Sequence, residues 1–74
     1  MTEKTTGDVR ITLNGERRVF PEGTTLLSLV RALNLEPERV AVELNRAIVR
    51  RDKWLETVVG AGAEIEIVMF VGGG

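Results

Sequence analysis

The residues whose type and position could support chemistry are the last three, Gly72, Gly73 and Gly74. Glycine has no Cβ, so a run of three forms a thin segment that can enter a narrow channel in another protein. The α-carboxylate of Gly74 would then reach the active site of that protein without steric hindrance. The triplet therefore favours a tail that is presented to a partner, and the simpler alternative is an unstructured terminus.

The chain lacks the side chains that most enzymes use for catalysis. It has no Cys, His or Tyr, and Ser28 is its only serine. A Ser-His-Asp or Cys-His site therefore cannot form within the chain, and neither can a disulfide or a zinc–thiolate site. We predict that the protein is not an enzyme, has no metal site and no cofactor, and obtains any chemistry from a partner.

The charges of the chain are balanced, with ten basic and eleven acidic side chains and a formal net charge of −1. This balance provides no general attraction to nucleic acid or to an anionic membrane. Residues 1–8 are polar and lack the apolar segment of a secretory signal. We expect a cytoplasmic protein that binds neither nucleic acid nor membrane and is a monomer when free.

The 74 residues fit one domain, which we place at 9–71, after a disordered lead-in at 1–8 and before a flexible tail at 72–74. Apolar residues that alternate with polar ones predict half-buried strands. The predicted strands are 9–13, 17–20, 40–44, 47–49 and 64–69. In the last strand, Ile65, Ile67 and Met69 are expected on the buried face.

One substantial helix is predicted between the second and third strands. Thr24 or Thr25 can cap its first turn. One helical face is formed by Leu26, Leu29, Val30 and Leu33. The helix should end near residues 34–35, because Pro37 disfavours helical geometry in the residue before it.

Turn signals connect these elements. Asn14-Gly15 predicts a type I′ hairpin turn, in which both residues have positive φ. A second tight turn is predicted at Asn45-Arg46. Asp52 is a candidate cap for a short helical turn carrying Trp54, which we interpret as a core residue.

The element order β-β-α-β-β-β predicts an α+β protein of the β-grasp, or ubiquitin-like, class. An amphipathic helix must cover the apolar face of a sheet, so the strands are expected to form one mixed sheet of about five. A ferredoxin-like fold is the rival, but it needs two helices of similar length.

With these features the chain resembles the ThiS family of thiamine-biosynthesis sulfur carriers, within the ubiquitin-like sulfur carriers. The matching segments are Asn14-Gly15-Glu16, Pro21-Glu22-Gly23-Thr24-Thr25-Leu26, Val40-Ala41-Val42-Glu43-Leu44-Asn45, Ile48-Val49, Arg51, Trp54, Ile65-Glu66-Ile67-Val68 and Phe70-Val71-Gly72-Gly73-Gly74. The chain departs from the family at Arg46, Arg50 and Ala63, where glycine, proline and aspartate are usual. These departures lie in loops and question the turn geometry, not the tail.

The resemblance implies a protein cosubstrate. In such carriers an ATP-dependent activating enzyme adenylates the terminal carboxylate, here that of Gly74. Sulfur from a cysteine desulfurase or another donor then replaces AMP and leaves a thiocarboxylate, which donates its sulfur to thiazole synthase. Gly72 and Gly73 would provide the reach.

A second candidate site adjoins the tail. Strand alternation turns Val68 and Phe70 away from the helix, and together with Val71 they predict a partner-binding patch. The alternative is that Phe70 packs on Phe20 and closes the end of the sheet.

A local basic run comprises Arg46, Arg50, Arg51 and Lys53. It is interpreted as a solvated loop, with contact to an acidic partner as the alternative. Other functions also remain open: the small subunit of molybdopterin synthase, a sulfur carrier for cysteine or methionine synthesis, and a ubiquitin-like binding module whose tail is never activated.

Overall fold

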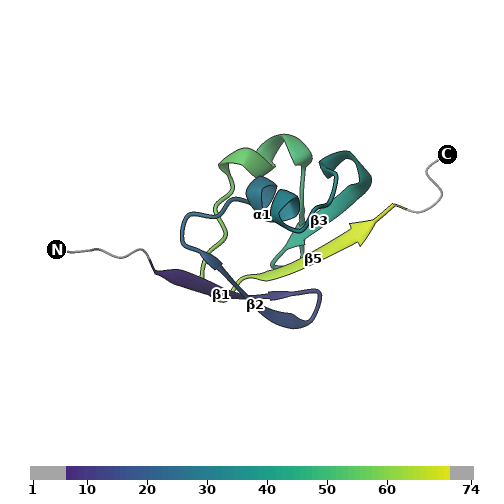
Figure 1. Cartoon of the computed structure of the whole chain (residues 1–74). Coiled ribbons are helices and arrows are strands. Elements are labelled where there is room, and N and C mark those ends of the chain that lie inside the picture. Colours follow the sequence, from purple (N-terminus) through teal and green to yellow (C-terminus); the bar gives the residue numbers. More distant parts are fainter. Residues whose placement is uncertain (1–6, 71–74) are drawn as a thin grey trace.

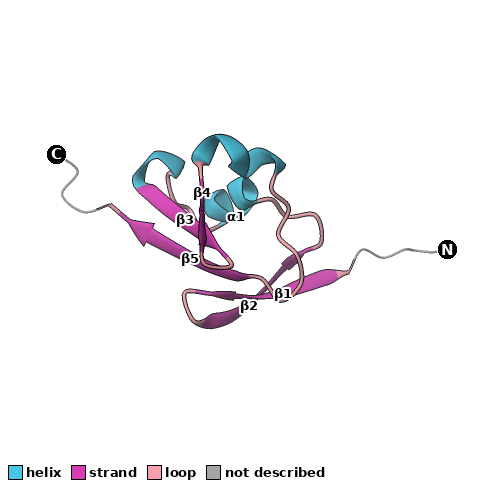
Figure 2. Ribbon diagram, turned by 180° about the vertical axis from the view of Figure 1, so that it is seen from behind, coloured by secondary structure: helices cyan, strands magenta, loops and turns pink. Residues whose placement is uncertain are grey.

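The computed structural model describes residues 7–70. Within this range, the helices lie on one face of a single sheet, as two opposite views show (Figure 1 and Figure 2). The principal helix α1 spans Leu26–Ala32, and two short 3₁₀ helices, η1 and η2, span Pro37–Arg39 and Arg51–Glu56. One face of the sheet is therefore covered by helices, and we refer to the other as the open face.

The sheet is mixed and has five strands in the order β2-β1-β5-β3-β4. The strands are β1 (Asp8–Leu13), β2 (Glu16–Pro21), β3 (Val40–Leu44), β4 (Ala47–Val49) and β5 (Glu64–Met69). The central strand, β5, runs parallel to β1 and antiparallel to β3. Two hairpins joined through a central last strand, with one main helix packed across them, form the β-grasp fold, which confirms the predicted fold class.

Both hairpins turn on residues with positive φ. Asn14 and Gly15 have φ values of 49° and 83°, which confirms the predicted type I′ turn. Asn45 and Arg46 have φ values of 52° and 73° in the second hairpin. Arg46 therefore occupies the left-handed region, where a glycine would be free of the strain that Cβ causes.

The helix α1 begins with a reciprocal cap between two hydroxyl side chains. The Ser28 N–H donates to the Thr25 hydroxyl at 3.1 Å, and the Thr25 N–H donates to the Ser28 hydroxyl at 2.9 Å. The helix ends at Ala32, earlier than the predicted stop near residues 34–35, and Asn34 then adopts a φ of 62°. Pro37 begins η1, a short helix that the sequence patterns do not predict.

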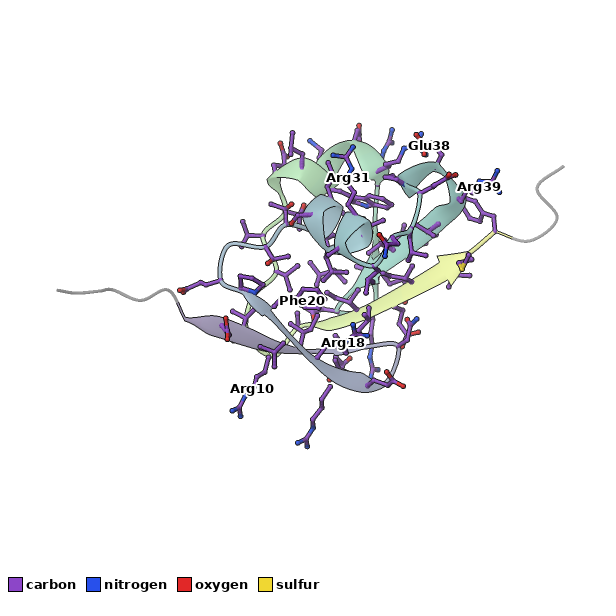
Figure 3. All side chains as sticks on the ribbon, viewed as in Figure 1. Arg10, Arg18, Phe20, Arg31, Glu38 and Arg39 are labelled. Atoms are coloured by element: carbon purple, nitrogen blue, oxygen red, sulfur yellow. The ribbon has the colours of Figure 1, made fainter. Side chains whose placement is uncertain are left out.

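The core lies between α1 and the inner face of the sheet, where the side chains fill the space (Figure 3). Leu26, Leu29 and Val30 are completely buried, which confirms the predicted helix face. The other core residues are Val9, Ile11, Leu13, Val40, Val42, Trp54, Val59, Ala63, Ile65 and Ile67. Arg10, by contrast, projects from the open face (Figure 3).

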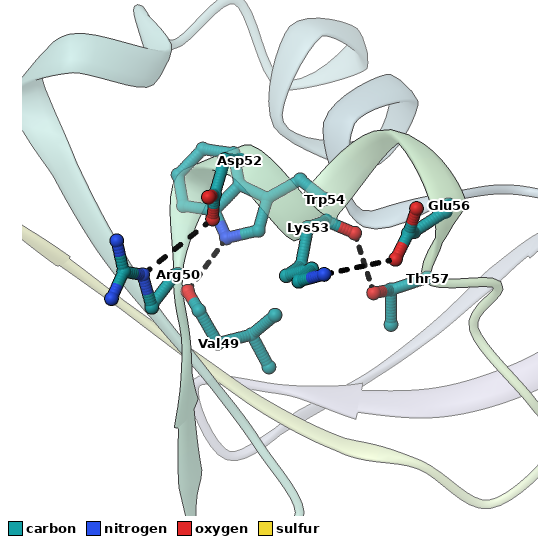
Figure 4. A network of polar contacts seen from close by, with 7 residues as sticks. All are labelled: Val49, Arg50, Asp52, Lys53, Trp54, Glu56 and Thr57. Atoms are coloured by element: carbon teal, nitrogen blue, oxygen red, sulfur yellow. Dashed lines mark hydrogen bonds and ion pairs between the residues drawn. The ribbon is translucent and has the colours of Figure 1, made fainter.

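The helix η2 adds a large aromatic side chain to the core. Trp54 is buried, and its indole N–H donates to the Val49 carbonyl at 2.8 Å (Figure 4). Its interpretation as a core residue is thus confirmed. The predicted cap at Asp52 is wrong: η2 begins at Arg51, so Asp52 lies inside the first turn and pairs with Arg50 at 3.6 Å instead.

Candidate functional site

The candidate site lies at the end of β5, Met69, which precedes the three glycines at 72–74 in the sequence. Val71, Gly72, Gly73 and Gly74 fall outside the described residues, so their roles stay predictions. The end of β5 and the start of β1 lie at opposite ends of the sheet (Figure 1). The described part of the site is thus the end of β5, Phe70 and the surfaces beside them.

On the β1 side, β5 is bonded as far as Ile67. The Asn14 N–H donates to the Ile65 carbonyl at 2.8 Å. The Asn14 side chain then continues the pairing: its Oδ1 accepts from the Ile67 N–H at 2.7 Å, and its Nδ2 donates to the Ile67 carbonyl at 3.3 Å. The amide of Asn14 therefore takes the place of one further strand residue after β1 has ended.

On the β3 side, a second turn asparagine holds the start of β5. The Asn45 N–H donates to the Glu64 carbonyl at 2.7 Å, and its Oδ1 accepts from the Glu64 N–H at 2.9 Å. Both turns are predicted from the sequence, but these side-chain bonds are not. They connect residues that are 19 or 53 positions apart, so only the strand register brings them together.

Beyond Ile67 the chain becomes exposed. Val68 and Phe70 are 57% and 59% exposed, which confirms that both side chains point away from the core. Val68 lies opposite Ala41 on the open face. Their predicted role in binding is a separate matter and stays a prediction.

The prediction that Met69 lies on the buried face with Ile65 and Ile67 is wrong. Its side chain is 57% exposed, although it pairs with the buried Val40. The reason lies in the neighbouring strand, because β1 ends at Leu13 and provides no cover alongside Met69. The exposed apolar surface at the root of the tail therefore includes Met69.

The alternative that Phe70 closes the sheet against Phe20 is wrong. Phe20 pairs with Val9 near the start of β1 and packs against the core. Phe70 follows the end of β5, well past the last pairing of β5 with β1, at Leu13. The two rings thus lie toward opposite ends of the sheet. Phe70 is held through its backbone instead, since its N–H donates to the Arg39 carbonyl at 2.8 Å.

The open face beside Val68 carries a shallow acidic depression. Its volume is about 420 Å³, and its lining residues are Thr12, Gly15, Glu43, Arg46, Glu64, Ile65, Glu66 and Val68. Glu43 and Glu66 are directly opposite each other on β3 and β5, an arrangement in which like charges destabilise the sheet. Glu64 is paired with Arg46 at 3.6 Å. These carboxylates are not among the residues predicted from the sequence, although Glu64 and Glu66 alternate with Ile65 and Ile67 along β5.

The basic run does not form one patch. Arg46 lies in the β3–β4 turn and pairs with Glu64, while Arg50 and Lys53 pair at 3.6 Å with Asp52 and Glu56 near η2 (Figure 4). All these side chains are exposed, so each pair contributes little to stability. The pairs are local and agree with a solvated loop.

Residues 7–70 contain no group of three or more acidic, His or Cys side chains arranged to hold a metal ion. No helix among them has the length and apolar character needed to span a bilayer.

The fold and the glycine sequence after its central strand define the class, a ubiquitin-like β-grasp protein with a C-terminal glycine tail. The model of the ThiS family matches residues 7–74. The crystal structure of a thiamine biosynthesis protein (ThiS) from Geobacter metallireducens is 32% identical, with a TM-score of 0.77 over 89% of this chain and 100% of that one. An NMR structure of a Geobacter metallireducens thiamine biosynthesis protein has a TM-score of 0.75 at the same identity, over 89% of this chain and 88% of that one. The chain belongs to the ThiS family.

Two sequence relatives are much longer proteins. A thiazole synthase of Magnetococcus marinus is 44% identical over 66 residues, and one of Paramagnetospirillum magneticum is 36% identical over 66 residues. In both cases the match covers 89% of this chain but only 20% of the relative. The chain thus spans about a fifth of the length of these thiazole synthases.

Proposed function

We propose that the protein carries sulfur for the thiazole ring of thiamine, as a thiocarboxylate on Gly74. Membership of the ThiS family and the similarity to a thiamine biosynthesis protein of Geobacter metallireducens, seen in a crystal structure and in an NMR structure, support the role of a thiamine sulfur carrier. The observation that carries the proposal is the course of β5. Its first half is bonded on both sides, its last residues and Phe70 are exposed, and three glycines follow at 72–74 in the sequence.

The proposed chemistry begins with activation, because a carboxylate is anionic and a poor electrophile. An activating enzyme transfers AMP from ATP to the Gly74 carboxylate and releases pyrophosphate. A persulfide on a cysteine desulfurase or another donor then attacks the acyl carbon and displaces AMP. The chain has no cysteine, so a thiol of a partner must split the resulting acyl disulfide, which leaves the thiocarboxylate on Gly74.

Thiazole synthase is the proposed acceptor of the sulfur. Two relatives of that name contain a segment similar to this chain within a longer polypeptide. A carrier segment in the same polypeptide as a synthase keeps the tail at high effective concentration near its acceptor. These relatives therefore support thiazole synthase as a partner of this chain.

The surface around the tail supports docking. Val68, Met69 and Phe70 are large apolar side chains that are exposed in succession, and such patches mark interaction sites. We propose that Val68 and Phe70, with Val71, contact the protein that receives the tail. The acidic depression next to Val68 fits a partner that presents basic side chains there.

The proposal is tested by incubating the chain with the activating enzyme of the same organism, ATP and a sulfur donor. The expected result is an increase in intact mass equal to the difference between sulfur and oxygen, located on Gly74 by fragmentation. Omission of ATP is the control and should abolish the increase. A chain that binds the enzyme but never gains this mass would be a ubiquitin-like binding module instead.

A further inference from the structure

The backbone groups of β5 alternate between its two neighbours. Its even-numbered residues bond to the β3 side: the Glu64 carbonyl accepts from Asn45 at 2.7 Å, and the Phe70 N–H donates to Arg39 at 2.8 Å. These bonds lie at the two ends of one antiparallel register. Residues with even numbers between them therefore also direct their N–H and C=O groups toward β3.

The odd-numbered residues face the β1 side. The Ala63 and Ile65 carbonyls accept from Thr12 at 2.9 Å and from Asn14 at 2.8 Å. The N–H and C=O of Ile67 are both bonded by the side chain of Asn14. The β1 side of β5 is therefore satisfied as far as Ile67 and no farther.

Met69 is the next residue in this series. Its N–H and C=O point to the side where β1 would continue, but β1 ends at Leu13 and the Asn14 amide is already used. Its register partner, Val40, lies at a position that exchanges no hydrogen bonds. Within residues 7–70 the alternation thus leaves both main-chain groups of Met69 without a partner. An unpaired strand edge of this kind is a template for another strand.

The position of this edge relative to the tail limits what can cover it. Four residues separate Phe70 from the end of the chain, and they span at most about 14 Å when extended. An enzyme that holds the Gly74 carboxylate at its reacting atoms therefore also lies beside Met69. Both views show the end of β5 projecting past the β1–β2 hairpin (Figure 1 and Figure 2), so that side is accessible.

We propose that the activating enzyme adds an extended segment to this edge, with main-chain bonds to the Met69 N–H and C=O. This inference rests on the proposed function, since the tail must enter that enzyme. Added strands gain affinity from main-chain bonds and specificity from the alternating side chains, which here are Val68 and Phe70. Loss of the Met69 N–H should therefore lower affinity for the activating enzyme, whereas a change of the Met69 side chain alone should not.

Met69→Pro removes this N–H without removing a ladder bond to β3, and proline is compatible with such an edge position. Met69→Ala is the matched control, because it shortens the side chain and keeps the N–H. We expect Met69→Pro to bind the activating enzyme about tenfold more weakly than Met69→Ala, since a partner carbonyl loses its donor. Both variants should melt close to the natural chain.

A chemically synthesised chain with N-methylated Met69 deletes the same donor without the proline ring. The N-methylated chain replaces Met69→Pro in the affinity measurement if the proline variant does not fold. Amide hydrogen exchange provides a second measurement. The Met69 amide should exchange rapidly in the free chain and slowly in the complex, whereas the Phe70 amide, already bonded to Arg39, should be protected in both.

Three results would overturn the inference. They are equal affinities of the Met69→Pro and Met69→Ala chains, a Met69 amide that stays unprotected in the complex, and protection that appears at high concentration without enzyme. The last result would identify a second copy of this chain as the added strand. If the natural chain binds the enzyme but is never adenylated, the proposed function fails, whereas adenylation with equal affinities refutes the added strand alone.

Discussion

Residues 64–67 and residues 68–70 follow each other along the chain, yet they are held in opposite ways. The first segment is bonded on both sides and buries Ile65 and Ile67. The second segment pairs only with the β3 side of the sheet, and its three large apolar side chains are exposed. The comparison shows where stability ends and recognition begins: one segment anchors the tail to the fold, and the next is available to a partner.

The two segments also differ in what a substitution should change. Buried side chains contribute to the free energy of unfolding, whereas consecutive exposed apolar side chains contribute little to it and much to binding. Substitutions of the residues that pack against or bond to residues 64–67 should therefore lower the free energy of unfolding. Substitutions that shorten the exposed side chains of Val68 or Phe70 should lower affinity for the partner.

The largest effect is expected in the core beneath β5. Leu29 is completely buried, so Leu29→Ala should lower the free energy of unfolding by about 2–5 kcal/mol. The total free energy of unfolding of a domain this small lies near the low end of about 5–15 kcal/mol, so the variant should be close to unfolding. Urea denaturation measures the change, with the exposed Leu55→Ala as control. A loss below about 1 kcal/mol would contradict the assigned helix face.

A smaller loss is expected from Asn14→Gly. Glycine keeps the positive φ of the turn, so the substitution isolates the two bonds between the Asn14 side chain and Ile67. Stability should fall by about 1–3 kcal/mol, because the Ile67 N–H and C=O lose their partners. The Ile67 amide should also exchange faster with solvent. Unchanged exchange at Ile67 would mean that the asparagine does not anchor the strand.

Phe70→Ala should separate binding from stability. The ring is exposed, so the melting temperature should barely change, while affinity for the activating enzyme should fall by about 1–2 kcal/mol. Calorimetric melting and a binding titration on the same variant measure both quantities. Leu55→Ala, which removes another exposed apolar side chain, should leave the affinity unchanged. A large loss of stability with unaltered affinity would show that Phe70 serves the fold and not the binding of a partner.

The smallest effect, with the opposite sign, is expected in the β3–β4 turn. Arg46 has a φ of 73°, so Arg46→Gly should raise stability by up to about 1 kcal/mol through relief of backbone strain. The exposed pair with Glu64 that it removes contributes little. Arg50→Gly, at a φ of −65°, is the control and should destabilise. Equal effects of the two substitutions would show that the turn is not strained.

Local patterns in the sequence predict most of the fold. Alternation identifies the faces of Ile65 and Ile67, the spacing of Leu26, Leu29 and Val30 identifies the buried helix face, and Asn14-Gly15 identifies the first turn. These features depend on neighbours within a few residues. They can therefore be recognised without knowing which strands pair.

The features that local patterns miss depend on pairing between distant strands. Asn14 contacts Ile67 only because β1 runs parallel to β5 in one particular register. Met69 continues the buried alternation of β5 but is exposed, because β1 ends before reaching it. For the candidate site, the sequence thus indicates Val68 and Phe70, and only the structure adds Met69 and the acidic depression.

The division between anchor and tail is tested most directly by deleting Gly73 and Gly74. We expect the truncated chain to melt at the same temperature as the natural one, because the last core residue in the sequence is Ile67 and the deletion removes no part of the core. The same chain should transfer no sulfur in an assay that forms the thiazole with the activating enzyme, the sulfur donor and thiazole synthase. Sulfur transfer by the truncated chain at the natural rate would contradict the account.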